Sequence, residues 1–270
     1  MGDGPIAGKE LVHLWCAYPD DLMDAETARA CERLLSEDER VRLERFKFDR
    51  HRREYLATRG VGRTALSAYA EVAPEDWRFE AGEHGKPAIA SDMVGRAMGL
   101  SFNLSNSLGL VVCAVSHGAE IGVDVEPCTR AKTIEEVAER FFSARELEQL
   151  GELRGEEKRE RGLTLWTLKE AYMKARGLGM ALPTNLFSFV FGGGGEISLE
   201  IDARAGDAAE RWRFCMVDHA GHRIALMVEG ESVPELDVWE ARPLPGEARQ
   251  VEVGGLRWWP TSQRVSELAS

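Results

Sequence analysis

Stretches in which apolar and polar residues alternate are spread along this chain, and longer stretches with a helical apolar period lie between them. Alternation or a short apolar run predicts strands at 12–17, 100–105, 108–115 and 121–126, and hairpins over 187–201 and 212–228. Between 77 and 89, a turn is expected to lead to an edge strand. Helical spacing predicts helices at 24–35, 37–66, 134–150 and 163–176. The charged stretch 151–162 is predicted to be an exposed loop or a frayed helix.

Each half of the chain thus carries a helical stretch followed by antiparallel strands, although the residues themselves show no repeat. The simplest architecture is an α+β fold of two similar lobes, each with helices packed on a small antiparallel sheet. We expect an N-terminal lobe over 1–118, a C-terminal lobe over 119–230, and an extension without a predicted role over 231–270.

The strand-like stretch 121–126 holds two carboxylates, Asp124 and Glu126, between apolar residues. Alternate side chains of a strand share a face, so both carboxylates should point the same way, roughly 6.5–7 Å apart. That spacing lets both reach one hard cation. The alternative, open at this point, is an exposed strand with a solvated acidic face.

The helix predicted at 163–176 places Trp166, Glu170 and Lys174 on one face, because they are four residues apart. Together with Asp124 and Glu126, Glu170 would complete a set of three carboxylates able to hold Mg²⁺. Lys174 would then lie beside any phosphate bound to the metal. An ordinary exposed Glu–Lys pair is the alternative.

Charge is distributed unevenly along the 270 residues, whose formal net charge is −12. This excess of acid argues against a general nucleic-acid binder, which needs a basic surface. A basic segment within the helix predicted at 37–66 nevertheless suggests one local anionic ligand, with a solvated helix face as the alternative. Its basic residues are Arg40, Arg42, Arg45, Lys47, Arg50, Arg52, Arg53, Arg59 and Arg63.

The five cysteines are scattered and form no C-x-x-C pair, which argues against a disulfide framework and a structural zinc site. No apolar run approaches the roughly 20 residues that span a bilayer, and the first residues do not resemble a secretion signal. We therefore expect a cytoplasmic protein without a membrane segment.

None of the common nucleophile, zinc-protease or dinucleotide motifs is present in the sequence. Elimination therefore favours metal-assisted chemistry on a phosphate or pyrophosphate. A phosphohydrolase using the same carboxylates is one alternative. A non-catalytic module that binds a carrier protein or coenzyme A is another.

The stretches 121–126 and 166–174 resemble the two signature motifs of the Sfp-type 4′-phosphopantetheinyl transferases. Supporting stretches at 85–87, 102–105, 140–143 and 178–183 follow in the order that the family shows, so that the resemblance runs from about Trp15 to Val228. It implies a monomeric pseudo-dimer that binds coenzyme A in the cleft between its lobes. Such an enzyme transfers the phosphopantetheine arm to a serine of an apo acyl or peptidyl carrier protein and releases adenosine 3′,5′-bisphosphate. The carriers serve fatty-acid, polyketide or nonribosomal peptide biosynthesis.

By position, the resemblance implies that Asp124, Glu126 and Glu170 hold Mg²⁺, or Mn²⁺ in its place. Glu170 would also take the proton of the attacking serine, directly or through a water. Lys174 would stabilise charge on the phosphate under attack. Asp124, Glu170 and Lys174 are thus the expected catalytic residues.

The resemblance implies that coenzyme A contacts Lys86, Ser105 and Lys174. An arginine of the basic segment, for which we select Arg53, would bind its 3′-phosphate. The sequence departs from the family at Asn106, where a histidine often follows the serine matching Ser105. An amide donates hydrogen bonds but carries no charge. We therefore expect the 3′-phosphate contact to be weaker at this position or to shift to the arginines.

Overall fold

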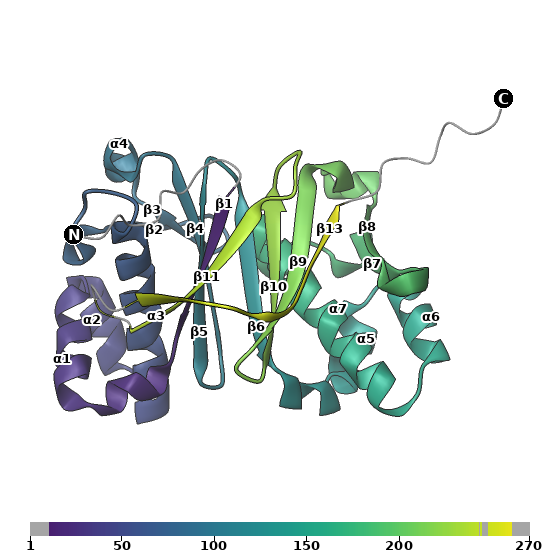
Figure 1. Ribbon diagram of the computed structural model, residues 1–270, viewed down its shortest axis with the longest axis horizontal. Coiled ribbons are helices and arrows are strands. Elements are labelled where there is room, and N and C mark those ends of the chain that lie inside the picture. The colour runs from purple at the N-terminus through teal and green to yellow at the C-terminus, as the bar shows by residue number, and fades with distance from the viewer. Residues whose placement is uncertain (1–10, 243, 245–247, 261–270) are drawn as a thin grey trace.

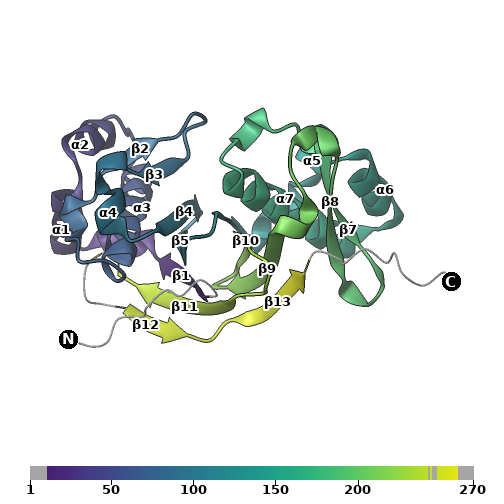
Figure 2. The ribbon, with the colours of Figure 1, turned by 90° about the horizontal axis from the view of Figure 1, so that it is seen from above.

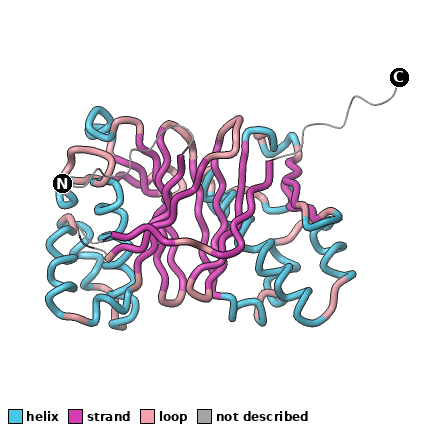
Figure 3. Tube along the Cα trace, in the orientation of Figure 1, coloured by secondary structure: helices cyan, strands magenta, loops and turns pink. Residues whose placement is uncertain are grey.

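Helices form the two flanks of the molecule, and two sheets lie side by side between them (Figures 1 and 3). The structure is a computed structural model that describes residues 11–242, 244 and 248–260. Its helices are α1 (Ala25–Leu34), α2 (Glu37–Glu44), α3 (Asp49–Ser67), α4 (Val94–Ala97), α5 (Glu135–Phe141), α6 (Ala144–Glu152) and α7 (Gly155–Ala175). Among the described helices, none is long and apolar enough to cross a membrane.

The strands form two groups along the chain. Those of the first half are β1 (Leu11–Ala17), β2 (Phe79–Ala81), β3 (Pro87–Ile89), β4 (Leu100–Ser107) and β5 (Leu110–His117). Those of the second half are β6 (Ile121–Pro127), β7 (Phe187–Phe191), β8 (Ile197–Ile201), β9 (Trp212–His219), β10 (His222–Glu229), β11 (Glu235–Ala241), β12 (Ala248–Val251) and β13 (Gly254–Pro260). The larger sheets run β12-β11-β1-β5-β4 and β13-β9-β10-β6, and β2–β3 and β7–β8 form two small hairpins. The α+β fold class is confirmed, and the parallel pair of β1 with β11 makes the first sheet mixed.

The two large sheets share a core, because their strands alternate between two apolar faces. On β5, Val111 and Cys113 point into the core beneath α1 and α3, while Val112 points the other way. On β6, Val123 and Val125 point into the same shared core, which also takes residues from β1, β9 and β10. Gly122, Asp124 and Glu126 therefore face away from the shared core.

Strands β4 and β6 end their respective sheets, and side chains rather than a backbone ladder join them. The amide of Val123 donates to Asn103 Oδ1 at 2.9 Å, and the amide of Val125 donates to Ser105 Oγ at 3.3 Å. These bonds satisfy backbone donors on the edge of a buried strand that no neighbouring strand covers. The junction consequently brings side chains of the N-terminal lobe against the carboxylates of the C-terminal lobe.

The described part of 231–270 adds strands to both large sheets (Figure 2). β11 pairs with β1, and β13 pairs with β9. Trp239 stacks on Trp15 with ring centroids 5.7 Å apart, and Trp259 stacks on Phe214 at the same distance. This segment therefore binds to both large sheets, a role that the sequence did not predict; residues 261–270 lie outside the described part of the chain.

One long helix was expected over 37–66, and the structure divides it into α2 and α3. The predicted capping box is present, with Ser36 and Glu39 exchanging hydrogen bonds at the start of α2. The break follows Glu44, and Arg52 donates to the carbonyl of Leu43 at 3.1 Å, which satisfies an acceptor at the end of α2. A side chain of α3 thus caps the C-terminal end of α2.

Helix α7 begins at Gly155, so most of the stretch 151–162, for which a loop and a frayed helix were both open, is ordered helix. Tertiary contacts explain the difference: Arg223 of β10 pairs with Glu160 at 2.8 Å, and Arg161 lies over the ring of Phe191 at 3.8 Å. The helix propensity of the stretch 151–162 does not take such contacts into account.

Candidate active site

The acidic strand is buried over its whole length, from Ile121 to Pro127. Asp124 is 4% exposed and Glu126 is 5% exposed. The alternative of a solvated acidic face is therefore wrong. Two buried carboxylates require partners, because burying an isolated charge is costly.

Helix α7 lies directly against β6, and Gly122 permits this approach. A Cβ at Gly122 would lie 2.8 Å from the Cα of Ala175 and still closer to the carbonyl oxygen of Ala171. Real Cβ atoms essentially never lie that close to backbone atoms. The absence of a side chain at this position brings the face of α7 that carries Glu170 and Lys174 onto the acidic strand.

Three predicted site residues meet at the junction of the lobes. Lys174 Nζ lies 2.7 Å from Asp124 Oδ1 and 2.8 Å from Ser105 Oγ. Ser105 in turn donates to Asp124 Oδ1 at 3.0 Å. Residues from β4, β6 and α7 thus form one polar cluster, in which the lysine is the positive group.

Asp124 retains unused hydrogen-bonding capacity in this cluster. Its Oδ2 is buried and has no hydrogen-bond partner among the described residues. Burial raises the pKa of the Asp124 carboxyl, Glu126 adds to the rise, and Lys174 opposes it. A buried carboxylate oxygen without a donor is typical of a site that receives a cation or a protonated group.

Glu170 faces the same cluster from α7. Burial raises the pKa of its carboxyl, the charge of Asp124 raises it further, and Lys174 opposes this. Within the described part of the chain, Glu170 has no hydrogen-bond or ion-pair partner. Two neighbouring carboxylates with raised pKa values and unused oxygens are what a cation would relieve.

Glu126 is held more tightly than Asp124. Its Oε1 accepts from Trp166 Nε1 at 2.9 Å and pairs with Arg130. Its Oε2 accepts from Ser107 Oγ at 3.1 Å. The sequence placed Trp166 on the face of Glu170 and Lys174, and the structure shows that its indole contacts the acidic strand.

The carboxylates fit a hard divalent cation by their chemistry and by the unpaired Asp124 oxygen. As placed, however, no three His, Cys, Asp or Glu side chains in the described residues converge to hold a metal ion. One of the three predicted ligands, Glu126, is paired with Arg130 instead. Asp124 and Glu170 are thus available, whereas Glu126 would have to exchange a partner.

Lys86 reaches across from the turn between β2 and β3. Its Nζ donates to the carbonyls of Ile121 at 3.1 Å and Ala175 at 3.2 Å, and pairs with Glu120 at 3.3 Å. It therefore links the N-terminal lobe to the start of β6 and the end of α7.

Asn106 directly follows Ser105 on β4, and neighbouring side chains of a strand point to opposite faces. Ser105 is buried in the cluster with Lys174, whereas Asn106 is exposed. The position at which the sequence departs from the family pattern therefore lies outside this cluster.

The basic segment is largely paired within the N-terminal lobe. Arg59 and Arg63 both bind Glu39, and Arg50 and Arg52 pair with Glu54 and Glu32. Within the described residues, the basic side chains of this segment without an ion-pair partner are Arg42, Arg45, Lys47 and Arg53. This set retains the predicted Arg53 and adds three neighbours.

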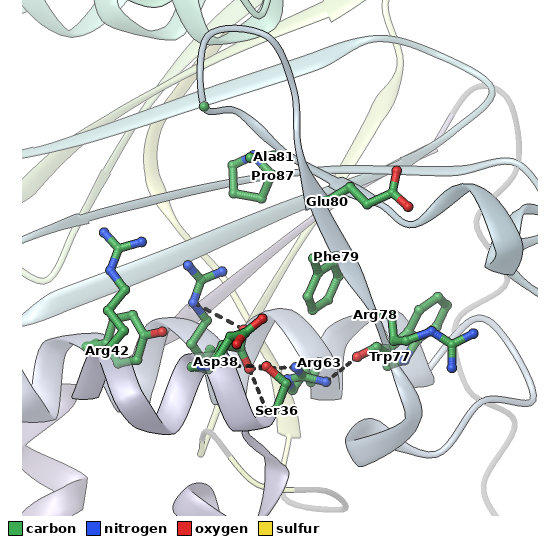
Figure 4. A pocket seen from close by; sticks show the side chains of 14 residues that line it. Ser36, Asp38, Arg42, Arg63, Trp77, Arg78, Phe79, Glu80, Ala81 and Pro87 are labelled. Carbon is green, nitrogen blue, oxygen red and sulfur yellow. Dashed lines mark hydrogen bonds and ion pairs between the residues drawn. The ribbon is translucent and has the colours of Figure 1, made fainter. Parts of the chain in front are cut away.

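A pocket of about 460 Å³ lies between α2, α3 and the β2–β3 hairpin, and Figure 4 shows the side chains that line it. Arg42 lines it together with Arg63 and Arg78, and Pro87 borders it next to Lys86. Arg53 is not among the residues that line this pocket. Arg42 thus shares a pocket with the hairpin that carries Lys86, and Arg53 does not.

Sequence reasoning missed a second ion pair on α7. Lys169 Nζ binds Glu146 at 2.8 Å and the carbonyls of Thr184 and Phe187 at 2.8 and 3.0 Å. Both charged side chains are buried, at 2% and 0% exposure. The capping box that Glu146 forms with Ser143 was a signal in the sequence, but its buried lysine partner was not. This pair fixes α7, and with it Glu170, against α6 and β7.

Comparison with known families identifies the class of protein. The model of the 4′-phosphopantetheinyl transferase superfamily matches residues 120–227, and that of the 4′-phosphopantetheinyl transferase N-terminal region matches residues 23–118. The chain belongs to the 4′-phosphopantetheinyl transferase family, as the sequence motifs predicted, and is an enzyme of this class.

Two relatives illustrate the similarity. The chain is 41% identical over 170 residues to the 4′-phosphopantetheinyl transferase HetI of Nostoc sp., a match that covers 63% of this chain and 70% of HetI. It is 31% identical over 187 residues to the 4′-phosphopantetheinyl transferase Sfp of Bacillus subtilis, a match that covers 68% of this chain and 79% of Sfp. Residues beyond 227 lie outside both family models.

Proposed function

We propose that this enzyme transfers the 4′-phosphopantetheine arm of coenzyme A to a serine of an apo acyl or peptidyl carrier protein. The products are the holo carrier and adenosine 3′,5′-bisphosphate. The observation that carries the proposal is the cluster at the lobe junction, where Lys174 lies beside an Asp124 whose second oxygen has no partner among the described residues. A site with one cation and unsatisfied carboxylates suits a pyrophosphate bound together with a divalent metal.

The chemical step is a displacement at phosphorus. The serine Oγ of the carrier forms a bond to the phosphorus next to the pantetheine arm, and the bond from that phosphorus to the bridging oxygen breaks. The hydroxyl proton passes to Glu170, directly or through a water. The raised pKa of the Glu170 carboxyl makes it a better base near neutral pH than an ordinary glutamate.

Lys174 and the carboxylates supply the electrostatics of the transfer. Lys174 would place its charge on the phosphate under attack, where negative charge develops. Asp124 and Glu170 would hold Mg²⁺, with Glu126 as the third ligand once it leaves Arg130. Bound Mg²⁺ would offset charge on the pyrophosphate oxygens and lower the barrier to loss of the leaving group.

The nucleotide end of coenzyme A is assigned to the N-terminal lobe. Lys86 and Ser105 are the expected contacts, and Arg53 or Arg42 would bind the 3′-phosphate. Asn106 is exposed and uncharged, so an arginine should carry most of this recognition. KM measured with coenzyme A and with dephospho-coenzyme A tests this: Arg53→Gln or Arg42→Gln should reduce the discrimination, whereas complete loss with Asn106→Ala alone would contradict it.

The test of the function itself uses apo carriers from fatty-acid, polyketide and peptide synthesis. The enzyme is incubated with coenzyme A and Mg²⁺, and mass spectrometry follows addition of the phosphopantetheine arm to each carrier. A chelator should stop the reaction. Consumption of coenzyme A without any modified carrier would favour a phosphohydrolase, and binding without turnover would favour a non-catalytic module. The family resemblance also leads us to expect a monomer, which light scattering measures.

A further inference from the structure

Arg130 lies in the turn that follows β6 and was not part of the predicted site. Its guanidinium forms an ion pair with Glu126 and lies over the ring of Trp166, 5.1 Å from the ring centroid. Trp166 itself donates to Glu126 Oε1. Arg130 and Trp166 therefore bind the same carboxylate oxygen and pack on each other.

This arrangement gives Glu126 a complete set of partners that Asp124 lacks. Arg130 and Trp166 donate to Oε1, and Ser107 donates to Oε2. The side chain of Glu126 is 6% exposed, whereas that of Arg130 is 37% exposed. A positive group at the rim of the site thus neutralises a buried carboxylate from the solvent side.

A divalent cation on Glu126 would meet a positive charge already in place. Two like charges within a few ångströms repel each other strongly in a partly buried site. The guanidinium also occupies one oxygen of the carboxylate that would coordinate the metal. Metal and arginine therefore compete for Glu126. The stacking contact between Arg130 and Trp166 stabilises the arginine-bound state further.

We propose that Arg130 is a positioning residue that holds Glu126 while the site is free of metal and that a divalent cation must displace it. This inference rests on the proposed function, which assigns Glu126 to the metal. Because the side chain of Arg130 is partly exposed, its guanidinium can turn to solvent while its backbone stays in the turn after β6. Arg130 thereby lowers metal affinity without touching the reacting atoms.

The experiment is a titration of the metal-free enzyme with Mn²⁺, followed by calorimetry and by the electron paramagnetic resonance signal of free Mn²⁺. Arg130→Gln should bind Mn²⁺ about tenfold more tightly than the wild type, because one nearby positive charge is lost. Arg130→Lys should fall between them, since lysine keeps the charge but loses the planar contacts. Arg145→Gln is the control, because Arg145 pairs with exposed Glu200 in the same lobe and its loss changes net charge equally.

Unchanged or weaker Mn²⁺ binding by both Arg130 variants, in an enzyme whose wild type binds Mn²⁺ and modifies carriers, would overturn the inference and leave the proposed function intact. The metal assignment is tested separately by Asp124→Asn, which should lose Mn²⁺ binding. If wild type and Arg130→Gln both bind no Mn²⁺, the metal assignment and the inference fail together. If only Arg130→Gln binds Mn²⁺, the result supports competition between Arg130 and the metal for Glu126. Thermal unfolding of each variant checks that it is folded.

Discussion

Two lysines on α7, Lys169 and Lys174, serve different purposes. Lys169 has three acceptors, and its partner Glu146 uses both oxygens, accepting from Lys169, Ser143 and Phe189. Lys174 is 28% exposed, and its partner Asp124 keeps one oxygen without a donor in the described part of the chain. The first pair is closed and holds the helix in place. The second pair is open, because its lysine is partly exposed and its carboxylate can accept a further hydrogen bond or a cation.

The comparison shows that one helix carries both a structural ion pair and a pair that belongs to the candidate active site. A buried ion pair whose hydrogen bonds are all made gives a fixed geometry, and removing one member leaves an uncompensated charge. An ion pair with an unused hydrogen-bond acceptor lowers the stability of the free protein. Binding of a ligand to that acceptor restores the stability. Four substitutions separate these two roles.

Breaking the closed pair should have the largest effect. Lys169→Met is expected to lower the free energy of unfolding by about 3–5 kcal/mol, because it leaves Glu146 charged and buried. Urea denaturation followed by circular dichroism measures the loss. Lys158→Met, on the same helix at a lysine without an ion-pair partner in the described residues, should change little. Equal losses in the two variants would show that the pair does not support α7.

Removing the charge of Asp124 from the second pair should slow transfer without lowering stability. Asp124→Asn is expected to lower the transfer rate about 10²–10³-fold, because the site loses a carboxylate that would balance the cation. The temperature of unfolding should not fall, since burial already disfavours the charged form of Asp124 and raises its pKa. Carrier modification by mass spectrometry and thermal unfolding give the two readings. Asp218→Asn, at an exposed aspartate that pairs with Arg223 in the same sheet, is the control.

Moving α7 away from β6 should lower both stability and transfer. Gly122→Ala is expected to cost about 1–3 kcal/mol of stability, because the new methyl group meets the backbone of α7. Transfer should slow as well, since Glu170 and Lys174 would shift away from Asp124. Gly151→Ala in α6, where a Cβ would meet nothing within 4 Å, should be neutral or slightly stabilising. A Gly122→Ala enzyme of full stability and activity would contradict the role given to this contact.

The smallest effect concerns pH and Glu170. The pKa of Glu170 is raised in the folded protein, so the folded state holds this proton more tightly than the unfolded state. Its contribution to stability is therefore lost as pH rises from the unfolded value of about 4.3 through the raised folded value. In a chelator, Glu170→Gln should be more stable than wild type at pH 7 by about 0.5–2 kcal/mol, and equal to it below pH ~4.

Thermal unfolding across this pH range measures the difference between Glu170→Gln and wild type. Glu148→Gln is the matched control, because Glu148 is exposed on α6. A difference that stays constant with pH, or that grows as pH falls, would show that Glu170 is not strained in the metal-free enzyme.

Much of the fold follows from local pattern. Period-two and helical periods identified the hairpins at 187–201 and 212–228 and the helix that holds Glu170, and the capping box at Ser36 marked the start of α2. The same local spacing placed Asp124 with Glu126 and Glu170 with Lys174. Side chains two apart on a strand or four apart on a helix share a face whatever packs against them.

Other features depend on segments far apart in the chain. Helix α7 starts early because Arg223 of β10, 63 residues further along the chain, pairs with Glu160. The role of the described part of 231–270 was also not predictable, because a parallel pairing with β1 leaves no local signal. The local sequence pattern does not determine which distant part of the chain packs against a helix or strand.

The acidic strand illustrates this division. Its sequence alone determined that Asp124 and Glu126 lie on one face, and its resemblance to a transferase motif indicated the family. Only the tertiary structure decided that both carboxylates are buried, that Asp124 keeps an oxygen unpaired among the described residues, and that Arg130 holds Glu126. The physical reason is that spacing sets direction along a strand, whereas burial and charge pairing depend on what β4, α7 and the turn after β6 bring to that face.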